Sequence, residues 1–220
     1  MKETFFHSYL GKLCLLLVVI LLIIQALPHK TVHRSRLSTV WKLPLNTGAR
    51  QDWRSVYLET DAHFLAWRRT PNPRKPRRHT GIDLQNGKYW GGPGEPVYAM
   101  AAGKVLGVFD SHPDQRIVIE HQLADGRTVW SAYVHIAASR VSAGDFVDSE
   151  TVIARRLNQT ELDQYGSEYN HVHIEIMKKL PPLVNGQYQW MSTRCYSESQ
   201  VAQYFYNPKR FLNQRWQRIN

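Results

Sequence analysis

Three short segments carry histidines and a carboxylate at spacings that suit metal binding and acid–base chemistry. The first is His-Thr-Gly-Ile-Asp at 79–83, the second is Tyr-Val-His at 133–135, and the third is His-Val-His at 171–173. Residues at i and i+2 of a β-strand point to the same face, so the third segment would present two imidazoles together. Each segment alone is a weak signal, because a single histidine on a strand is more often structural than functional.

Taken together, the segments contain the ligand types that a catalytic zinc ion uses. Zinc takes imidazole nitrogen and carboxylate oxygen in a tetrahedral site, and a catalytic site keeps one position for water. Two imidazoles and one carboxylate would supply three protein ligands. Two histidines would remain to take a proton from water and to donate to a developing oxyanion. The chain has only two cysteines, Cys14 and Cys195, which excludes a cysteine-rich zinc site and a disulfide framework.

The elements that would position these segments are short strands. Apolar or alternating runs follow one another from residue 96 at about the 8–12-residue spacing that is typical of antiparallel all-β domains. Asp125-Gly126 is a strong hairpin signal between two of them. The runs are 96–100, 104–109, 116–121, 128–136, 146–147, 152–154 and 171–177. We therefore expect a mainly β fold with an antiparallel sheet core.

The remaining segments predict loops and short helices. Residues 68–78 hold six cations and three prolines, which favours an extended loop. The polar stretch 158–170 is expected to be a long loop. Short C-terminal helices are expected at 198–205 and 208–216, and Pro208 suits the first turn of the second.

In their order and spacing, these segments resemble the lysostaphin/LytM-type zinc metallopeptidases. The resemblance covers roughly residues 76–178. It rests on the segments at 79–83, 94–99 (Gly-Glu-Pro-Val-Tyr-Ala), 101–105 (Ala-Ala-Gly-Lys-Val), 133–136 (Tyr-Val-His-Ile) and 171–176 (His-Val-His-Ile-Glu-Ile). It implies a LytM/lysostaphin-like sheet core and a zinc-dependent endopeptidase that hydrolyses peptide cross-links of bacterial peptidoglycan.

The resemblance also implies a role for each candidate site residue. His79, Asp83 and His173 would bind one Zn²⁺ ion, and His171 and His135 would be the catalytic histidines that bind no metal. We expect His171 to act as the general base and His135 to stabilise the tetrahedral oxyanion. The sequence leaves the reverse assignment open.

Other details of the site remain open at this stage. Glu175 could orient a metal ligand or could face solvent. The turn at 165–170 has one glycine where the resemblance implies a glycine-rich turn, and the loop at 85–94 is longer than is common. Both departures concern substrate preference. Our preferred substrate bond is the D,D-cross-link of a Gram-negative-like wall, and glycine bridges are the alternative.

The N-terminal segment predicts export or anchoring. Residues 13–24 are uniformly apolar, 25–27 extend the run, and Pro28 ends it. A basic start and a short apolar run are typical of a secretory signal, whereas a spanning helix needs about 20 apolar residues. No small-residue cleavage site follows, so a retained apolar helix with inner-membrane association through residues 13–27 is the alternative. Four basic residues within 30–42 would favour the cytoplasm, yet the site chemistry favours the periplasm or cell envelope.

The resulting division of the 220 residues has four parts. Residues 1–28 are a signal peptide or N-terminal membrane anchor, and 29–58 are a basic linker. Residues 59–180 are the zinc metallopeptidase domain, and 181–220 are a C-terminal extension of unassigned role. A chain of this length fits one main domain, and we expect a monomer.

The charge of the chain allows two rival functions. There are 28 Lys and Arg against 18 Asp and Glu, a net charge of +10. A basic chain can indicate nucleic-acid binding, but we find no recognition-helix or RNA-binding motif, and we expect peptidoglycan stem peptides, not nucleic acid, as the partner. The other rival is a catalytically inactive LytM-like module that binds the cell wall or activates a hydrolase. The presence of all five candidate residues favours the enzyme.

Overall fold

The computed structural model describes residues 37–217, apart from 49, 59–60, 69–75 and 87–92. The predicted N-terminal apolar helix and the proposed membrane association through 13–27 lie outside the described residues. Among those described, no helix is long and apolar enough to cross a membrane.

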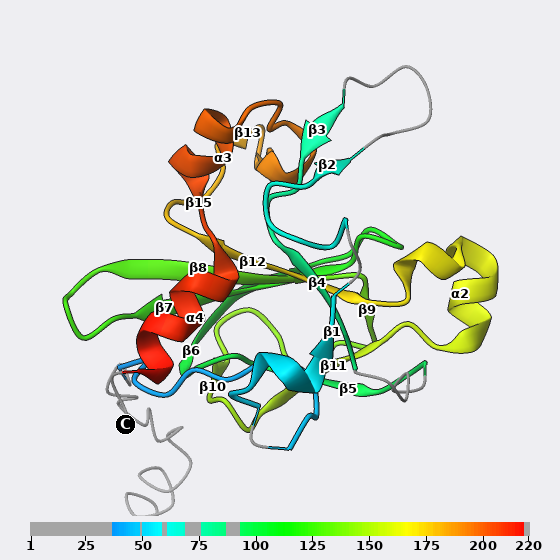
Figure 1. Ribbon diagram of the computed structural model, residues 1–220, viewed down its shortest axis with the longest axis horizontal. Coiled ribbons are helices and arrows are strands. Elements are labelled where there is room, and N and C mark those ends of the chain that lie inside the picture. The colour runs from blue at the N-terminus through cyan, green and yellow to red at the C-terminus, as the bar shows by residue number, and fades with distance from the viewer. Residues whose placement is uncertain (1–36, 49, 59–60, 69–75, 87–92, 218–220) are drawn as a thin grey trace, which may run out of the picture. The chain divides into compact units, whose positions relative to one another are not determined.

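One large antiparallel sheet is the framework of the molecule (Figure 1). Its strand order is β1-β4-β12-β8-β7-β6-β10, and β15 also pairs with β12. The strands are β1 (Val56–Tyr57), β4 (Ile82–Asn86), β6 (Gly103–Phe109), β7 (Arg116–Gln122), β8 (Thr128–Val134), β10 (Phe146–Val147), β12 (Val172–Met177) and β15 (Phe205–Tyr206). The antiparallel pairing confirms the mainly β fold that the sequence predicts.

Smaller elements surround this sheet. A three-stranded sheet has the order β5-β11-β9, and the pairs β2–β3 and β13–β14 form two small sheets. Their strands are β2 (Trp67–Arg68), β3 (Arg77–Arg78), β5 (Pro96–Tyr98), β9 (Ile136–Ala137), β11 (Val152–Arg156), β13 (Leu183–Val184) and β14 (Gln187–Tyr188). The helices are α2 (Gln159–Tyr165), α3 (Glu198–Tyr204) and α4 (Pro208–Trp216), with 3₁₀ turns η1 (Trp53–Ser55), η2 (Ser167–Tyr169) and η3 (Met191–Thr193).

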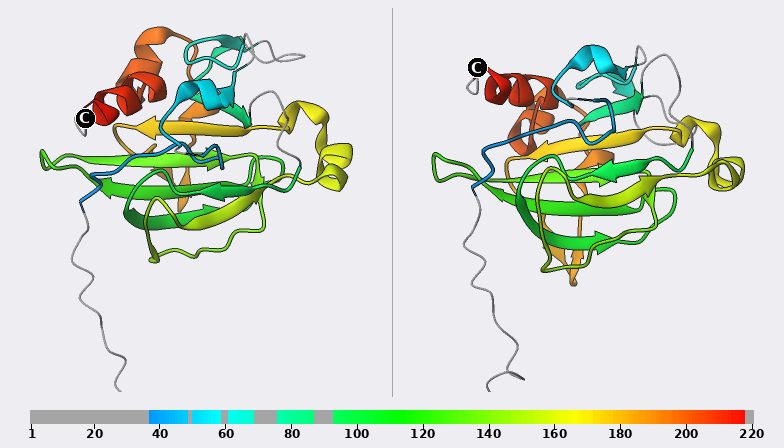
Figure 2. Two further views of the ribbon diagram at one scale, coloured as in Figure 1. Left: turned by 60° about the horizontal axis from the view of Figure 1, so that its bottom comes forward. Right: turned by 90° about the horizontal axis from the view of Figure 1, so that it is seen from below.

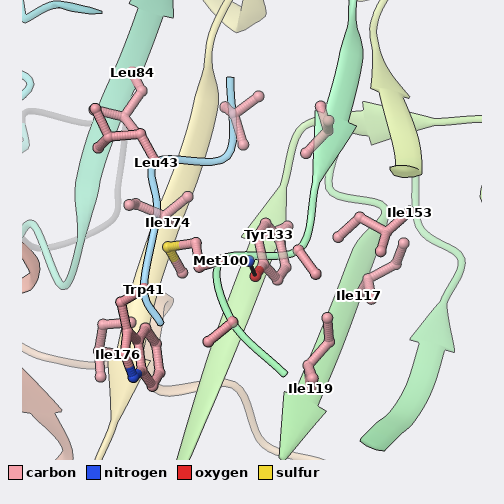
Figure 3. Close-up of a cluster of buried hydrophobic side chains, with 14 of the residues drawn as sticks. Trp41, Leu43, Leu84, Met100, Ile117, Ile119, Tyr133, Ile153, Ile174 and Ile176 are labelled. Carbon is pink, nitrogen blue, oxygen red and sulfur yellow. Dashed lines mark hydrogen bonds between the residues drawn. The ribbon is translucent and has the colours of Figure 1, made fainter. Parts of the chain in front are cut away.

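The main hydrophobic core lies against one face of the large sheet (Figure 3). The alternation in β12 sends Val172, Ile174 and Ile176 into this core, together with residues of β7, β8 and the three-stranded sheet. Trp41 and Leu43, which precede the first described strand, are also fully buried there. The division of the chain at residue 58 stays a prediction, but this part of the expected linker packs in the core.

The C-terminal extension covers the opposite face of the sheet. Cys195, Val201 and Phe205 from the extension are buried against residues of β7, β8 and β12. All six residues of β12 are buried, although successive residues of the strand face opposite sides of the sheet. Cys195 carries a free, buried thiol.

Helix α4 lies beside the N-terminal part of the described chain, as Figures 1 and 2 show in red and blue. The indole Nε1 of Trp216 donates to the carbonyl oxygen of Trp41 at 2.9 Å, and Trp53 Nε1 donates to Asn213 Oδ1 at 2.6 Å. Helices α3 and α4 confirm the two predicted C-terminal helices. In α4, Asn207 accepts from the Arg210 amide and Pro208 occupies the first turn.

The prediction of a long loop over 158–170 is wrong, because the segment contains α2 and η2. A capping box begins α2: Asn158 Oδ1 accepts from the Glu161 amide at 2.9 Å, and Glu161 Oε2 accepts from the Asn158 amide at 2.7 Å. Leu162 is the buried residue of this seven-residue helix, so the apolar periodicity that marks a helix is nearly absent.

Candidate active site and metal centre

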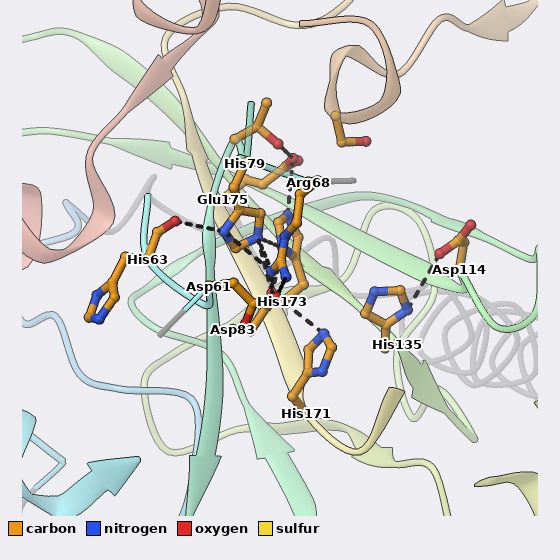
Figure 4. A network of polar contacts seen from close by, with 12 residues as sticks. Asp61, His63, Arg68, His79, Asp83, Asp114, His135, His171, His173 and Glu175 are labelled. Atoms are coloured by element: carbon orange, nitrogen blue, oxygen red, sulfur yellow. Dashed lines mark hydrogen bonds and ion pairs between the residues drawn. The ribbon is translucent and has the colours of Figure 1, made fainter. Parts of the chain in front are cut away.

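The register of two neighbouring strands brings the expected metal ligands together. Strands β4 and β12 are antiparallel, and Asp83 is paired directly with His173. His79 lies in the turn between β3 and β4. Its Nε2 atom is 2.9 Å from His173 Nδ1 and 3.1 Å from Asp83 Oδ1, and His173 Nδ1 is 2.9 Å from the same oxygen. These three buried side chains form a group that could hold a metal ion (Figure 4).

Gly81 permits the close approach of the His79 turn to β12. A Cβ atom at this position would lie 2.1 Å from the carbonyl oxygen of Ile174 and 2.8 Å from Cε1 of His173. Both distances are far inside van der Waals contact. A residue with a side chain would therefore push the His79 turn away from β12. The glycine of the His-Thr-Gly-Ile-Asp segment is needed to bring the candidate metal ligands together.

Each of the two imidazoles has one nitrogen facing the cluster and the other facing a protein oxygen. His79 Nδ1 is 2.9 Å from the carbonyl oxygen of His63, so it carries the proton and leaves the Nε2 lone pair facing the cluster. His173 Nε2 lies 3.2 Å from Glu175 Oε1, an ion-pair contact that leaves Nδ1 facing the cluster. Two imidazole nitrogens and one carboxylate oxygen thus converge, and once the imidazoles are deprotonated this is a donor set that zinc accepts.

Two carboxylates and two guanidinium groups set the charges around this cluster: Arg68 contacts Asp83, and Arg116 contacts Glu175. Burial acts to raise the pKa of Asp83, but the charge of His171 and hydrogen bonds from His173 and His79 hold that pKa well below its ordinary value. Burial acts to lower the pKa of His173, but hydrogen bonds to Asp83 and Glu175 raise it to about 9. Two buried carboxylates therefore face the imidazoles, and their charge favours a proton or a metal ion on the imidazole nitrogens.

Glu175 is a buried partner of His173 and does not face solvent. The residue is 1% exposed, and its carboxylate accepts from Thr80 Oγ1 at 2.6 Å and from Arg116 Nη1 at 2.8 Å. Burial acts to raise its pKa, but the Arg116 charge and the His173 contact lower it to about 2. Of the two alternatives left open by the sequence, the structure supports an orienting contact with the ligand imidazole.

His135 and His171, the two candidate histidines that are not expected to bind metal, lie together on one side of the candidate metal site (Figure 4). The rings of His135 and His171 are 4.9 Å apart and nearly perpendicular. His171 Nε2 is 3.5 Å from Asp83 Oδ1. Burial lowers the pKa of His135 to about 4 and that of His171 to about 3. Both rings are therefore neutral near pH 7 and are able to accept a proton.

The backbone of His135 is in an unusual conformation. The strand predicted over 128–136 breaks here into β8 and β9, because His135 has φ of 61°, in the left-handed region. Its Nδ1 donates to the carbonyl oxygen of Pro113 at 2.9 Å, and its ring packs 4.9 Å from that of Tyr169. These contacts hold a strained non-glycine residue in place, as is common at functional sites.

Arg68 is a site residue that the sequence did not single out from the basic run at 68–78. Its guanidinium, on β2, donates to Asp83 Oδ2 and lies 3.1 Å from Asp61 Oδ2 and 3.2 Å from His79 Nε2. The Asp83 carboxylate thus has one oxygen toward Arg68 and the other toward the histidines. Tyr169, beside His135, is a second site residue that the sequence did not single out.

A groove of about 800 Å³ surrounds these residues. One wall comes from the C-terminal extension, which begins outside the expected metallopeptidase domain. The lining residues are Arg68, Arg77, His79, Thr80, Asp83, Phe109, Ser111, Asp114, Arg116, Val134, His135, Glu168, Tyr169, His171, His173, Tyr188, Gln189, Trp190, Ser192, Thr193 and Arg194.

Comparison with solved structures gives several similar folds at low identity. LytU is 23% identical over 74% of this chain and 87% of its own, with a TM-score of 0.46. The catalytic domain of lysostaphin from Staphylococcus simulans is 21% identical over 62% and 80%, with a TM-score of 0.38. A mutant catalytic domain of the prophage-encoded protein EnpA from Enterococcus faecalis is 21% identical over 67% and 92%, with a TM-score of 0.41.

The sequence comparisons give one family match. No curated protein matches the chain by sequence. Residues 77–188 match the model of peptidase family M23, and this region contains all five candidate site residues. Because the match spans just over half of the 220 residues, the chain belongs to peptidase family M23, in agreement with its resemblance to the lysostaphin/LytM-type enzymes.

Proposed function

We propose that the protein is a zinc-dependent endopeptidase that hydrolyses peptide cross-links of bacterial peptidoglycan. The observation that carries this proposal is the convergence of His79, Asp83 and His173 beside two neutral histidines in one groove. Membership of a peptidase family supports the reaction class.

The chain's own residues would divide the work of hydrolysis. His79 Nε2, His173 Nδ1 and an Asp83 oxygen would hold Zn²⁺, which when bound polarises a scissile carbonyl and acidifies a water molecule. His171, whose Nε2 faces Asp83, would accept the proton of the attacking water. His135 donates from Nδ1 to Pro113, so its Nε2 can stabilise an oxyanion only after that atom has gained a proton.

The groove and the charge of the chain support the proposed substrate. Peptidoglycan stem peptides carry carboxylates, and the chain has a net charge of +10 with Arg68, Arg77 and Arg194 along the groove. D,D-cross-links are the preferred bond. The working place would be the periplasm or cell envelope, with residues 1–28 as signal peptide or anchor.

Mass spectrometry of muropeptide products tests the proposed reaction. The full chain, loaded with zinc, should cleave purified cross-linked muropeptides, and a chelator should abolish cleavage. His171→Ala should lose activity, whereas His63→Ala should retain it, because the exposed His63 side chain does not line the groove. Cleavage that persists in chelator, or an active His171→Ala variant, would contradict the mechanism.

One observation favours the alternative of an inactive cell-wall-binding or hydrolase-activating module. The Arg68 guanidinium contacts Asp83 and lies 3.2 Å from His79 Nε2, so it competes with a metal ion for the same atoms. This alternative predicts that the wild-type chain binds no zinc and that Arg68→Gln gains binding. Zinc bound by the wild type at one ion per chain, measured by elemental analysis after desalting, would show that Arg68 does not block the metal site and would remove this argument for the alternative.

A further inference from the structure

The C-terminal extension reaches the metal centre through a buried arginine. The segment involved, Trp190–Ser192, lies beyond residue 188, where the family match ends. Arg116 Nη2 donates to Ser192 Oγ at 3.1 Å, and the Arg116 guanidinium lies 4.4 Å from the centre of the Trp190 ring. The extension therefore supplies two of the contacts of a side chain that is only 7% exposed.

The same arginine holds the carboxylate that faces the ligand imidazole. Arg116 Nη1 donates to Glu175 Oε2 at 2.8 Å, while Glu175 Oε1 faces His173 Nε2 at 3.2 Å. Thr80 Oγ1 donates to Oε1 at 2.6 Å. Both Glu175 oxygens thus have partners, and Arg116 is the partner that holds Oε2.

A planar guanidinium is well suited to this position. Its N–H groups point in fixed directions within one plane. Contacts with a carboxylate, a hydroxyl and an aromatic face therefore determine the position of the whole group. The aromatic face is itself held, because the Trp190 ring packs 5.0 Å from Phe109 and 5.3 Å from Tyr188. Contacts thus run without a gap from the extension through Arg116 and Glu175 to His173.

We propose that Trp190 and Ser192 are positioning residues for the metal centre, acting on His173 through Arg116 and Glu175. The inference rests on the proposed metal site but not on the peptidase step. It gives residues 181–220 a role, because the extension then completes the outer shell of a site whose ligands all lie before it. Outer partners of metal ligands set ring orientation and basicity, and their loss weakens metal binding.

Zinc affinity of the full chain, measured by competition with a chromophoric chelator, tests this. Removal of a direct partner of a ligand typically weakens affinity about 10–100-fold, and we expect about fivefold for the more remote change Ser192→Ala. Ser192→Thr keeps the hydroxyl and should restore wild-type affinity. Ser199→Ala removes a hydroxyl from the exposed surface of the same extension and is the matched control.

A second readout reports on geometry. The visible spectrum of the Co²⁺-substituted protein should change in Ser192→Ala and in Arg116→Lys, and should be unchanged in Ser199→Ala. If Arg116→Lys does not fold, the comparison of Ser192→Ala with Ser192→Thr still tests the proposal. Wild-type zinc affinity in Ser192→Ala, a loss that Ser192→Thr does not restore, or a wild-type chain that binds no zinc would overturn the proposal. A wild type that binds zinc without cleaving muropeptides would contradict only the proposed function.

Discussion

At the residue scale, the candidate site depends on positions where one atom more or less has a large effect. Gly81 allows the turn that carries His79 to approach β12 closely. Glu175 contacts His173 Nε2, the ring nitrogen that does not face the other candidate ligands. His135 holds a left-handed conformation to reach its place beside His171. Each of these residues lies within or next to a segment that the sequence singles out.

A substitution at Gly81 should separate steric crowding from backbone strain. Gly81→Ala places Cβ 2.1 Å from a backbone oxygen, so it should lower the free energy of unfolding by about 3 kcal/mol, the upper range for overpacking. Gly126→Ala, in a turn with φ of 81° and open space, should cost only the left-handed penalty of about 1 kcal/mol. Denaturant unfolding measures both. Equal losses would contradict the steric argument.

His121 gives a pH prediction that is independent of the metal ligands. Its Nδ1 donates to the carbonyl oxygen of Ala102, its Nε2 accepts from Ser131 Oγ, and burial lowers its pKa from 6.5 to about 4. The unfolded chain therefore binds this proton first as pH falls, so stability is lost between pH 6.5 and 4, by about 3 kcal/mol at most. Unfolding midpoints of the wild type should fall over this range more steeply than those of His121→Asn. Parallel profiles would show that His121 contributes nothing.

At the element scale, the strands from β5 to β12 followed from the sequence, whereas β4, which carries Asp83, and helix α2 did not. β12 was predicted because Val172, Ile174 and Ile176 alternate with polar residues, and the hairpin at Asp125-Gly126 because its residues suit a turn. Helix α2 was missed because Leu162 alone is buried, and its capping box was the only local signal. Apolar periodicity detects elements that bury a face, and α2 is stabilised mainly at its end.

The capping box of α2 can be tested directly. Asn158→Ala removes the acceptor of the Glu161 amide and should lower the free energy of unfolding by about 1 kcal/mol. Asn158→Asp retains an acceptor and should cost little. Gln159→Ala, in the exposed first turn, is the control, since its side chain bonds only within the helix to Asp163. An Asn158→Ala chain as stable as the control would mean that the cap contributes nothing.

At the scale of the whole molecule, the family motifs pointed to candidate residues that the fold brings together, but not to the residues around them. The five candidate residues were identified because their order and spacing match a known family, and four of them are joined by the β4–β12 register and its adjoining turns. Arg116 could not be paired with Glu175 from sequence, because 59 residues separate them. The extension has no regular alternation of apolar and polar residues from which its packing against the sheet could have been predicted.

Metal binding should raise the stability of the whole domain. A ligand that binds only the folded state at 100 times its Kd adds about 2.7 kcal/mol. The melting temperature of the zinc-loaded chain should therefore exceed that of the chelator-treated chain and should increase with zinc concentration. His79→Ala removes one ligand and should melt at the same temperature with or without zinc. A zinc-dependent shift that survives in this variant would locate the binding elsewhere.

The position of β12 between β4 and β8 has a consequence for the synthesis of the protein. His173 and Asp83 are separated by 90 residues, and β12 can add to the sheet only after both neighbouring strands exist. A nascent chain that ends before residue 171 holds His79, Asp83 and His135 but has neither His171 nor His173. Pairing over such distances is intrinsically slow. The order of strands thus delays assembly of the candidate site until translation of the domain is nearly complete, so the candidate metal ligands meet only at a late stage of folding.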